Sequence, residues 1–146
     1  MPKKTKARIL HVDDNQDTRL LMAAVLGDAQ YGVMTAGTIS EAMQLAKDIE
    51  FDLFILDVRL EDGTGIELCQ KLRQLQPKVG VLYYSAYASD AEQQKALALC
   101  GDAYLRKPVG IADLEEAVAT QLAKKGIGVE KPAEVQEGAA APQQSP

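Results

Sequence analysis

The sequence has few cysteines, no excess of positive charge and no long hydrophobic run. Two cysteines, Cys69 and Cys100, cannot complete a cysteine metal site without a second pair, so we expect two buried free thiols in a reducing compartment. A net charge of -5 excludes a general electrostatic surface for nucleic acid or an anionic membrane. No apolar run approaches the roughly 20 residues of a membrane span. We therefore expect a soluble, cytoplasmic protein.

Apolar segments of strand length recur along the 146 residues, and helix-like segments separate them. The 47% hydrophobic content is sufficient for one domain with a substantial core. We expect this domain at residues 8–125, after a tail at 1–7. From 126–146 the helical spacing ends and Pro, Ala, Gln, Glu and Gly dominate, which predicts a disordered tail or linker without a DNA-binding or catalytic output domain. The expected strands are 8–12, 31–36, 53–56, 79–84 and 103–106.

Five expected helices follow the five strands. Three of them begin with Ser or Thr followed three residues later by Glu, at Thr38, Thr64 and Ser89, a pattern typical of a helix N-terminus. The first and last helices carry apolar residues at helical spacing, namely Leu21, Met22, Val25 and Leu26 in one and Ile111, Leu114, Val118 and Leu122 in the other. The alternation predicts an α/β fold, a doubly wound five-stranded parallel sheet with helices on both faces.

Polar side chains with complementary chemistry follow four of the expected strands. They are Asp13, Asp14, Asp57, Ser85 and Lys107. Ligands of an open parallel sheet bind at the carboxyl ends of its strands, so these groups should meet at one edge. Three carboxylates repel one another unless a cation lies among them, and hard oxygen ligands suit Mg²⁺. With a hydroxyl and an ammonium group beside them, the site can hold a phosphoryl group, and Asp57 is the best placed nucleophile.

Each of these residues also has an ordinary explanation. A single Asp after a strand is more often a loop or cap residue, a lone Ser85 can simply precede a helix, and a lone Lys107 can be a solvated cation. The five together, at the ends of the right strands, favour a functional site. The one histidine, His11, lies inside the first strand, where we interpret it as a packed residue rather than a phosphoryl carrier.

Residues 8–125 resemble the CheY-like receiver domain of response regulators in bacterial two-component signalling. The resemblance is carried by the acidic pair, by the single Asp after the third strand, by Ser85 followed by a small residue, by Lys107-Pro108, and by Asp62-Gly63. It implies the flavodoxin-like strand order 2-1-3-4-5 and a signalling phosphoacceptor rather than an enzyme. It also implies a cis peptide bond before Pro108.

The resemblance assigns a role to each site residue. Asp57 would accept a phosphoryl group from a sensor histidine kinase or a histidine phosphotransfer protein. Mg²⁺ would be bound by Asp14, Asp57 and the backbone carbonyl of Arg59, with Asp13 acting through water. Ser85 and the lysine after the fifth strand, Lys107, would bind the phosphoryl oxygens.

The resemblance also implies a switch. Ser85 would move toward the phosphoryl group, Tyr104 would rotate inward, and the face formed by the fourth helix, fifth strand and fifth helix would bind an unknown output protein. Arg59 and Tyr87 lie two residues beyond Asp57 and Ser85, and we expect both to restrict the attacking water and lengthen the phosphorylated lifetime.

Two other functions remain open from the residues alone. A Mg²⁺-dependent phosphohydrolase with an aspartyl-phosphate intermediate usually has a second Asp two residues after the nucleophile, where this chain has Arg59. A flavin or nucleotide-binding domain needs a hydroxyl- and glycine-rich phosphate loop after the first strand. Here that loop is acidic, from Asp13 through Gln16, and would repel phosphate.

Overall fold

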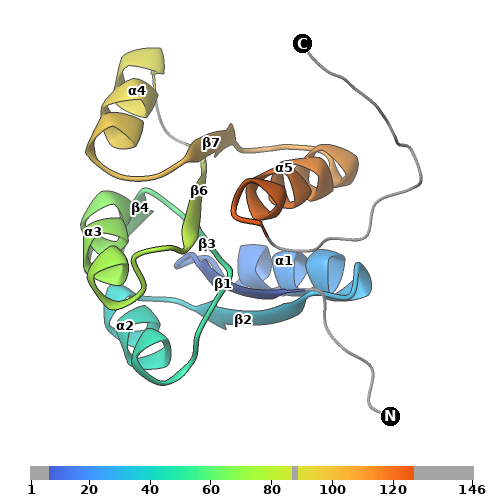
Figure 1. Cartoon of the computed structure of the whole chain (residues 1–146). Coiled ribbons are helices and arrows are strands. Elements are labelled where there is room, and N and C mark those ends of the chain that lie inside the picture. Colours follow the sequence, from blue (N-terminus) through green and yellow to red (C-terminus); the bar gives the residue numbers. More distant parts are fainter. Residues whose placement is uncertain (1–6, 87–88, 127–146) are drawn as a thin grey trace.

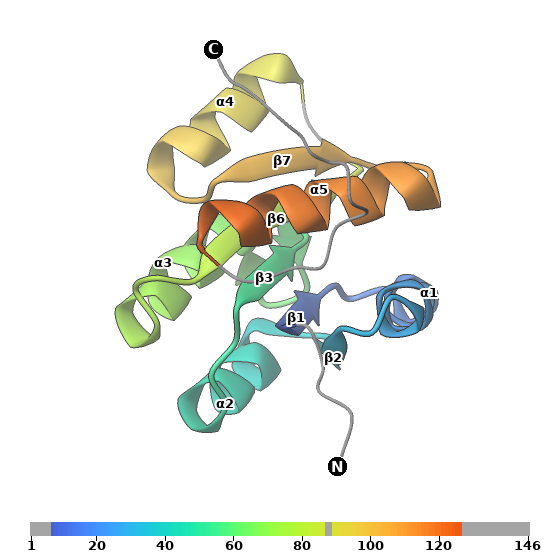
Figure 2. The ribbon, with the colours of Figure 1, turned by 45° about the vertical axis from the view of Figure 1, so that its right-hand side comes forward.

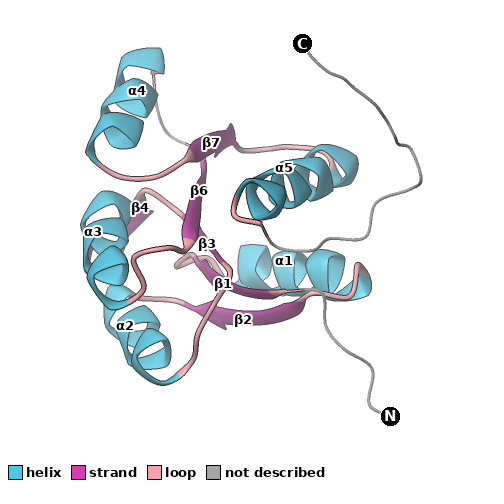
Figure 3. Cartoon of the chain, in the orientation of Figure 1, coloured by secondary structure: helices cyan, strands magenta, loops and turns pink. Residues whose placement is uncertain are grey.

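A computed structural model describes residues 7–86 and 89–126 as a parallel sheet covered by helices on both faces (Figures 1 and 3). The sheet strands are β1 (Arg8–Val12), β2 (Gly32–Ala36), β3 (Leu53–Leu56), β6 (Gly80–Ser85) and β7 (Ala103–Arg106). They are arranged in the order β2-β1-β3-β6-β7, and all neighbouring pairs are parallel. This order is the flavodoxin-like 2-1-3-4-5, so the predicted fold is confirmed.

Within the described residues, four helices connect the sheet strands and a fifth follows β7, and they divide between the two faces of the sheet. They are α1 (Gln16–Asp28), α2 (Ile39–Asp48), α3 (Gly65–Leu75), α4 (Asp90–Leu99) and α5 (Ile111–Lys124). The buried residues of α2, α3 and the end of α4 form one apolar cluster, and those of α1 and α5 form the other. The two groups lie on opposite sides of the sheet in both ribbon views (Figures 1 and 2).

The central strand β3 shows why an unbroken apolar run is needed here. Its residues face alternately into the two clusters: Phe54 and Leu56 into the cluster beneath α2 and α3, and Leu53 and Ile55 into the cluster beneath α1 and α5. All four are completely buried. A strand covered on both faces has no solvent side, so polar alternation disappears and the chain reads as Leu-Phe-Ile-Leu.

The expected caps are present. Thr64 and Ser89 each form a reciprocal capping box with Glu67 and Glu92, at the starts of α3 and α4. The Thr38 side chain accepts a hydrogen bond from the Glu41 amide at the start of α2. These bonds satisfy amide groups that have no partner within the helix.

Several apolar helix residues face away from the core. Leu21 in α1 is 59% exposed and Ile111 in α5 is 57% exposed, whereas Met22 and Leu26 carry the packing of α1. Apolar spacing alone therefore does not tell which of these residues face the core. Apolar residues at helical spacing cover a stripe that is wider than the part of the helix in contact with the sheet. Residues at the margin of this stripe therefore remain exposed.

Two local features were not predicted. Residues after β3 form a short antiparallel hairpin, β4 (Arg59–Leu60) with β5 (Gly63–Thr64), where the sequence indicated only a turn. Ala7 was assigned to the N-terminal tail, but it is buried in the α1/α5 cluster and its carbonyl accepts a hydrogen bond from the Gly32 amide. Ala7 is thus part of the packed domain.

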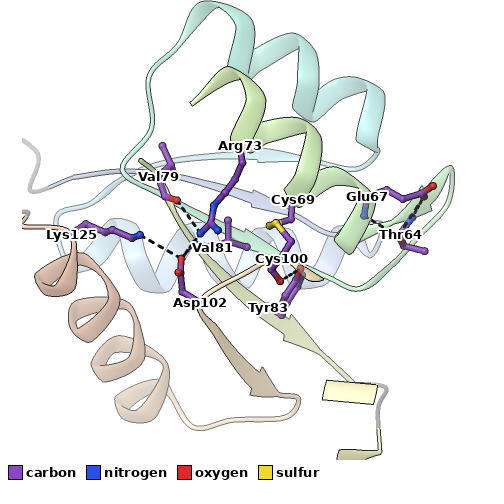
Figure 4. The surroundings of a disulfide bond; sticks show 10 residues. All are labelled: Thr64, Glu67, Cys69, Arg73, Val79, Val81, Tyr83, Cys100, Asp102 and Lys125. Carbon is purple, nitrogen blue, oxygen red and sulfur yellow. Dashed lines mark hydrogen bonds and ion pairs between the residues drawn. A yellow bond between two sulfur atoms is a disulfide. The ribbon is translucent and has the colours of Figure 1, made fainter. Parts of the chain in front are cut away.

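The two cysteines form a disulfide bond between Cys69 in α3 and Cys100 at the end of α4 (Figure 4). The expectation of two free thiols is wrong. Both residues are buried, as expected, but the parallel sheet brings α3 and the end of α4 together with their Cα atoms 6.1 Å apart. That separation lies within the range a disulfide can bridge.

Three sequence expectations concern regions outside the described residues. The tail at 1–7 is described only at its last residue, the segment 126–146 only at its first, and Tyr87 not at all. Within residues 7–86 and 89–126, no helix has both the length and the apolar character needed to cross a membrane.

Candidate functional site

The backbone ladder places the site residues directly beyond the strand ends. The Asp13 amide donates to the Ala36 carbonyl and the Asp57 amide to the Val12 carbonyl, each at 3.0 Å. These bonds continue the sheet pairing by one residue past β1 and β3. The side chains of both aspartates are therefore fixed at the carboxyl edge of the sheet, where parallel folds bind ligands.

Asp57 lies between a hydroxyl donor and an ammonium donor, one on each carboxylate oxygen. Its Oδ1 accepts from Ser85 Oγ at 2.7 Å and from the Arg59 amide at 3.3 Å. Its Oδ2 faces Lys107 Nζ at 3.3 Å. The residue is only 8% exposed, so these groups largely replace water around the carboxylate.

Asp13 is completely buried and holds Lys107 in place. Its Oδ2 lies 2.7 Å from Lys107 Nζ, and its Oδ1 accepts from the Asn15 amide at 2.9 Å. Burial alone would lower the pKa of Lys107, but the hydrogen bond to Asp13 and the negative charge of Asp57 outweigh it and raise the pKa. Lys107 is therefore charged at neutral pH, and the ring of Tyr84 lies 5.4 Å from its ammonium group.

Three carboxylates meet at this edge in an arrangement that fits a divalent cation. Oxygen atoms of Asp13, Asp14 and Asp57 all lie within 4.8 Å of one another, and Asp14 faces solvent. An all-oxygen donor set with one side open to water matches the preference of Mg²⁺, which keeps several water ligands. The residues present thus fit the metal that the sequence predicts.

A glycine lets the helix after the site approach the acceptor strand. At Gly65, the first residue of α3, a Cβ atom would collide with the backbone carbonyl of Asp57. The Gly65 amide also donates to the Val58 carbonyl at 2.7 Å. The close contact between this helix start and Asp57 therefore requires the absence of a side chain.

Ser85 connects Asp57 to the aromatic residue of the predicted switch. Ser85 Oγ donates to Asp57, and the Ser85 side chain lowers the pKa of the nearby Tyr104 phenol, although burial outweighs this effect and raises that pKa. The Tyr104 ring packs on the Tyr83 ring with a centroid distance of 5.7 Å. Tyr104 is thus partly buried and in contact with the site.

The structure brings together all five strand-end residues that the sequence singled out. The Lys107-Pro108 peptide bond is cis, in agreement with the resemblance. Sequence reasoning missed Arg19, whose Nη1 donates to the Asp13 carbonyl at 2.6 Å. A lone Arg in an amphipathic helix carries no signal that separates such a contact from a solvated charge.

His11 is a packed strand residue, as expected, and it adjoins the site. It is completely buried, and its Nε2 lies 3.9 Å from Asp13 Oδ2. Burial, reinforced by the positive charge of Lys107, lowers its pKa to about 3. The imidazole is therefore neutral at physiological pH.

Comparison with known proteins agrees with this geometry. The response regulator receiver domain family matches residues 9–119. The chain is 36% identical over 118 residues to the response regulator protein PilR of Pseudomonas aeruginosa, covering 81% of this chain and 26% of that protein. It is 31% identical over 108 residues to the histidine-protein kinase BarA of Escherichia coli, covering 73% of this chain and 12% of the kinase. The chain thus spans a minor part of these two relatives.

Solved structures of similar proteins share the fold. A CheY-like receiver domain protein from Methanospirillum hungatei has 31% identity and a TM-score of 0.77, over 82% of this chain and 95% of that one. A response regulator from Burkholderia pseudomallei, solved with a phosphorylated aspartic acid and a calcium ion, has 30% identity and a TM-score of 0.72, over 80% and 69% of the two chains. The match of sequence, fold and strand-end residues shows that this chain belongs to the response regulator receiver domain family of two-component signalling.

Proposed function

We propose that Asp57 accepts a phosphoryl group from the phosphohistidine of a sensor histidine kinase or a histidine phosphotransfer protein. A carboxylate oxygen of Asp57 attacks phosphorus, the P–N bond to the donor imidazole breaks, and the imidazole leaves with the bonding electron pair. The observation that carries this proposal is the placement of Ser85 and Lys107 on opposite oxygens of one nearly buried carboxylate. The phosphorylated aspartate of the Burkholderia relative supports the same chemistry here.

Ser85 and Lys107 act on the charge of the transferred group. Phosphoryl transfer depends mainly on positioning and on neutralising charge on the phosphoryl oxygens. Lys107 supplies a fixed positive charge, and Asp13 keeps it at the edge of the sheet through the 2.7 Å contact. Ser85 already donates to Asp57 and can redirect its hydroxyl to a phosphoryl oxygen.

Mg²⁺ would be held by Asp14, Asp57 and the backbone carbonyl of Arg59, with Asp13 acting through water. When bound, it supplies charge neutralisation for the phosphoryl oxygens. The short distances between the three carboxylates of Asp13, Asp14 and Asp57 support this assignment.

Phosphorylation would change the face made by α4, β7 and α5, which would then bind an output protein. A phosphoryl group adds about 1.5 to 2 negative charges and three strong acceptors beside Ser85. A Ser85 hydroxyl that turns to these acceptors would leave Asp57 Oδ1, and this movement would allow Tyr104 on β7 to rotate inward. Among the relatives are DNA-binding transcriptional activators such as DevR/DosR of Mycobacterium tuberculosis.

The proposal is tested by intact mass after incubation with Mg²⁺ and acetyl phosphate. We expect one added phosphoryl group on the wild type and none on Asp57→Asn, which has the same shape without the nucleophilic charge. The adduct should also disappear when EDTA replaces Mg²⁺. If a folded, Mg²⁺-binding wild type gives neither an adduct nor released phosphate, Asp57 is not a phosphoacceptor.

We further propose that Arg59 and Tyr87 lengthen the phosphorylated lifetime by restricting the attacking water. Arg59 is exposed at the edge of the site, two residues beyond Asp57. Arg59→Ala should release phosphate several-fold faster than the wild type after removal of the donor, and Tyr87→Ala should behave similarly. Unchanged decay rates in both variants would refute this role.

A further inference from the structure

The disulfide lies at the end of a continuous series of contacts that begins at the acceptor residue. Ser85 Oγ donates to Asp57 Oδ1 at 2.7 Å, and Ser85 lies two residues beyond Tyr83 on β6. The Tyr104 ring packs on Tyr83, and Tyr83 Oη donates to the Cys100 carbonyl at 2.7 Å. Figure 4 shows this last contact directly beside the bond from Cys100 to α3.

Non-covalent packing holds α4 only weakly. Ala96 is the single buried residue within the helix, and Leu99 is 52% exposed. The helix lies at the margin of the molecule beside β7 (Figure 1). A helix with so few buried contacts opens at low cost, so the disulfide bond adds to the packing of Leu97 on the core and to the ion pair of Asp90 with Arg106.

The chain just after α4 is anchored independently of the disulfide. The Asp102 carboxylate accepts from the Val81 amide at 2.8 Å and pairs with Arg73 of α3 at 2.7 Å (Figure 4). Between Cys100 and Asp102 lies Gly101, at φ +111°, where a Cβ would meet the Tyr83 ring. Cleaving the disulfide would therefore remove the covalent link between α4 and α3 and leave the Tyr83 hydrogen bond at Cys100, while the start of β7 stays in place.

We propose that Cys69 and Cys100 form a thiol–disulfide site whose oxidation state controls the response of α4 to phosphorylation. This inference rests on the proposed phosphoacceptor function. In the oxidised form the bond fixes the end of α4 to α3, and the Tyr83–Tyr104 contact opposes rearrangement beside Ser85. In the reduced form α4 moves more freely, so the phosphorylated arrangement is reached at lower cost.

The reductant would be a dithiol of the Cys-x-x-Cys class. One of its thiolates attacks Cys100 Sγ, the S–S bond breaks, and Cys69 leaves as a thiolate that takes up a proton. The second thiol of the reductant then displaces Cys100 from the mixed disulfide, and the reductant becomes a disulfide. Two electrons and two protons pass to the cysteine pair. Cys100 is the more accessible partner, with 9% exposure against 0% for Cys69.

The test compares the full chain after oxidation by oxidised glutathione and after reduction by a dithiol. Thiol alkylation followed by intact mass should add two labels only after reduction. Beryllofluoride with Mg²⁺, a stable mimic of the phosphoryl group, is then titrated by nuclear magnetic resonance. We expect the reduced form to bind it about five-fold or more tightly, within the usual range of coupling between two sites. Amides of α4 should also exchange faster in the reduced form, while those of β7 should not change.

Cys69→Ala serves as the control because it cannot form the bond. Its beryllofluoride affinity should equal that of the reduced wild type and should not respond to the reductant. If this variant does not fold, the wild type in its two oxidation states still decides the question. Two labels before reduction, or equal affinities in the two states, would overturn the inference. If neither state binds beryllofluoride although labelling shows the disulfide, the proposed phosphoacceptor function fails and the coupling fails with it.

Discussion

At the residue scale, one ammonium group of the candidate site lies between two carboxylates. Lys107 Nζ lies 2.7 Å from Asp13 and 3.3 Å from Asp57, so its single charge offsets part of the repulsion between them. Asp13 is more buried than Asp57 and has the shorter contact with Lys107. Asp57 is therefore the less firmly held by the Lys107 ammonium group. This asymmetry suits a positioning role for Asp13 and a reactive role for Asp57.

Gly65 gives a direct test of the close contact at the acceptor residue. Gly65→Ala should lower the free energy of unfolding by about 1 to 3 kcal/mol, because the new Cβ collides with the Asp57 carbonyl and forces α3 to shift. Urea unfolding measures this change. Gly27→Ala is the matched control, because no atom lies within 4 Å of the position that the new Cβ would take. Replacing a helical glycine there should stabilise the protein by about 0.5 to 1 kcal/mol. Equal effects at the two sites would contradict the predicted collision.

His11 should make the protein sensitive to mild acid. The unfolded chain takes up a proton at His11 near the ordinary pKa of 6.5, whereas the folded protein resists protonation down to about 3. The unfolded state therefore binds more protons between these values, and stability falls as the pH falls below 6.5. At pH 5 the loss should be about 2 kcal/mol relative to neutral pH.

The measurement is the free energy of unfolding of wild type and His11→Leu from pH 7 to pH 5, in EDTA. The variant should lose less stability over this range, because a leucine takes up no proton in the unfolded state. Identical pH dependence of the two proteins would show that His11 is not the group responsible.

At the scale of secondary-structure elements, a helix start can combine a local cap with contacts from distant parts of the chain. The clearest case is α2, which Thr38 caps locally and which also receives the carboxylate of Asp62 from the hairpin after β3. The Asp62 oxygens accept from the amides of Ile39 and Ser40 at 2.9 and 3.2 Å. The far end of α2 is held in a similar way, since the Gln76 amide group donates to the carbonyls of Ala46 and Ile49.

Asp62→Ala should destabilise the protein by about 0.5 to 1 kcal/mol, the lower part of the range for helix caps, because the carboxylate is exposed to solvent. The bond from the Ile39 amide is the main reason that the pKa of Asp62 is lowered. The stabilisation by the Asp62 carboxylate is thus present above the ordinary pKa of 3.8. It disappears as the pH falls through the lower pKa that Asp62 has in the folded protein. Urea midpoints of wild type and variant should differ at pH 7 and converge in strong acid. A constant difference across this range would argue against the charged cap.

At the scale of the whole molecule, the disulfide is the one covalent connection between elements that are distant in sequence, within the residues the structure describes. It closes a loop of 31 residues that contains β6 and most of α3 and α4. Such a link stabilises the fold mainly by restricting the unfolded chain.

Reduction should therefore lower the free energy of unfolding by about 3 to 4 kcal/mol, the value expected for a loop of this length. The measurement is urea unfolding with and without a non-thiol reductant. A Cys69→Ala, Cys100→Ala double variant should show no response to the reductant. If reduction left the wild-type midpoint unchanged, the bond would be absent or energetically neutral.

The sequence by itself determined the sheet strands and the residues that lie at their carboxyl ends. Those strands are local apolar runs, their helices carry local caps, and a polar residue at a strand end stays there whatever the distant contacts are. The strands 8–12, 53–56 and 103–106 were predicted with the bounds that the structure has. The same reasoning placed Asp57 and Lys107 at one edge before any contact was known, because parallel strands present their carboxyl ends together.

Only the tertiary structure decided which distant groups meet. The pairing of Cys69 with Cys100, the capping of α2 by Asp62 and the burial of Met22 rather than Leu21 all depend on how helices cross the sheet. Periodicity and capping patterns act over a few residues and carry no information about these distances. The site residues could be read from the sequence because the sheet fixes their place, whereas the contacts that join the site to α4 depend on packing between elements far apart in the chain.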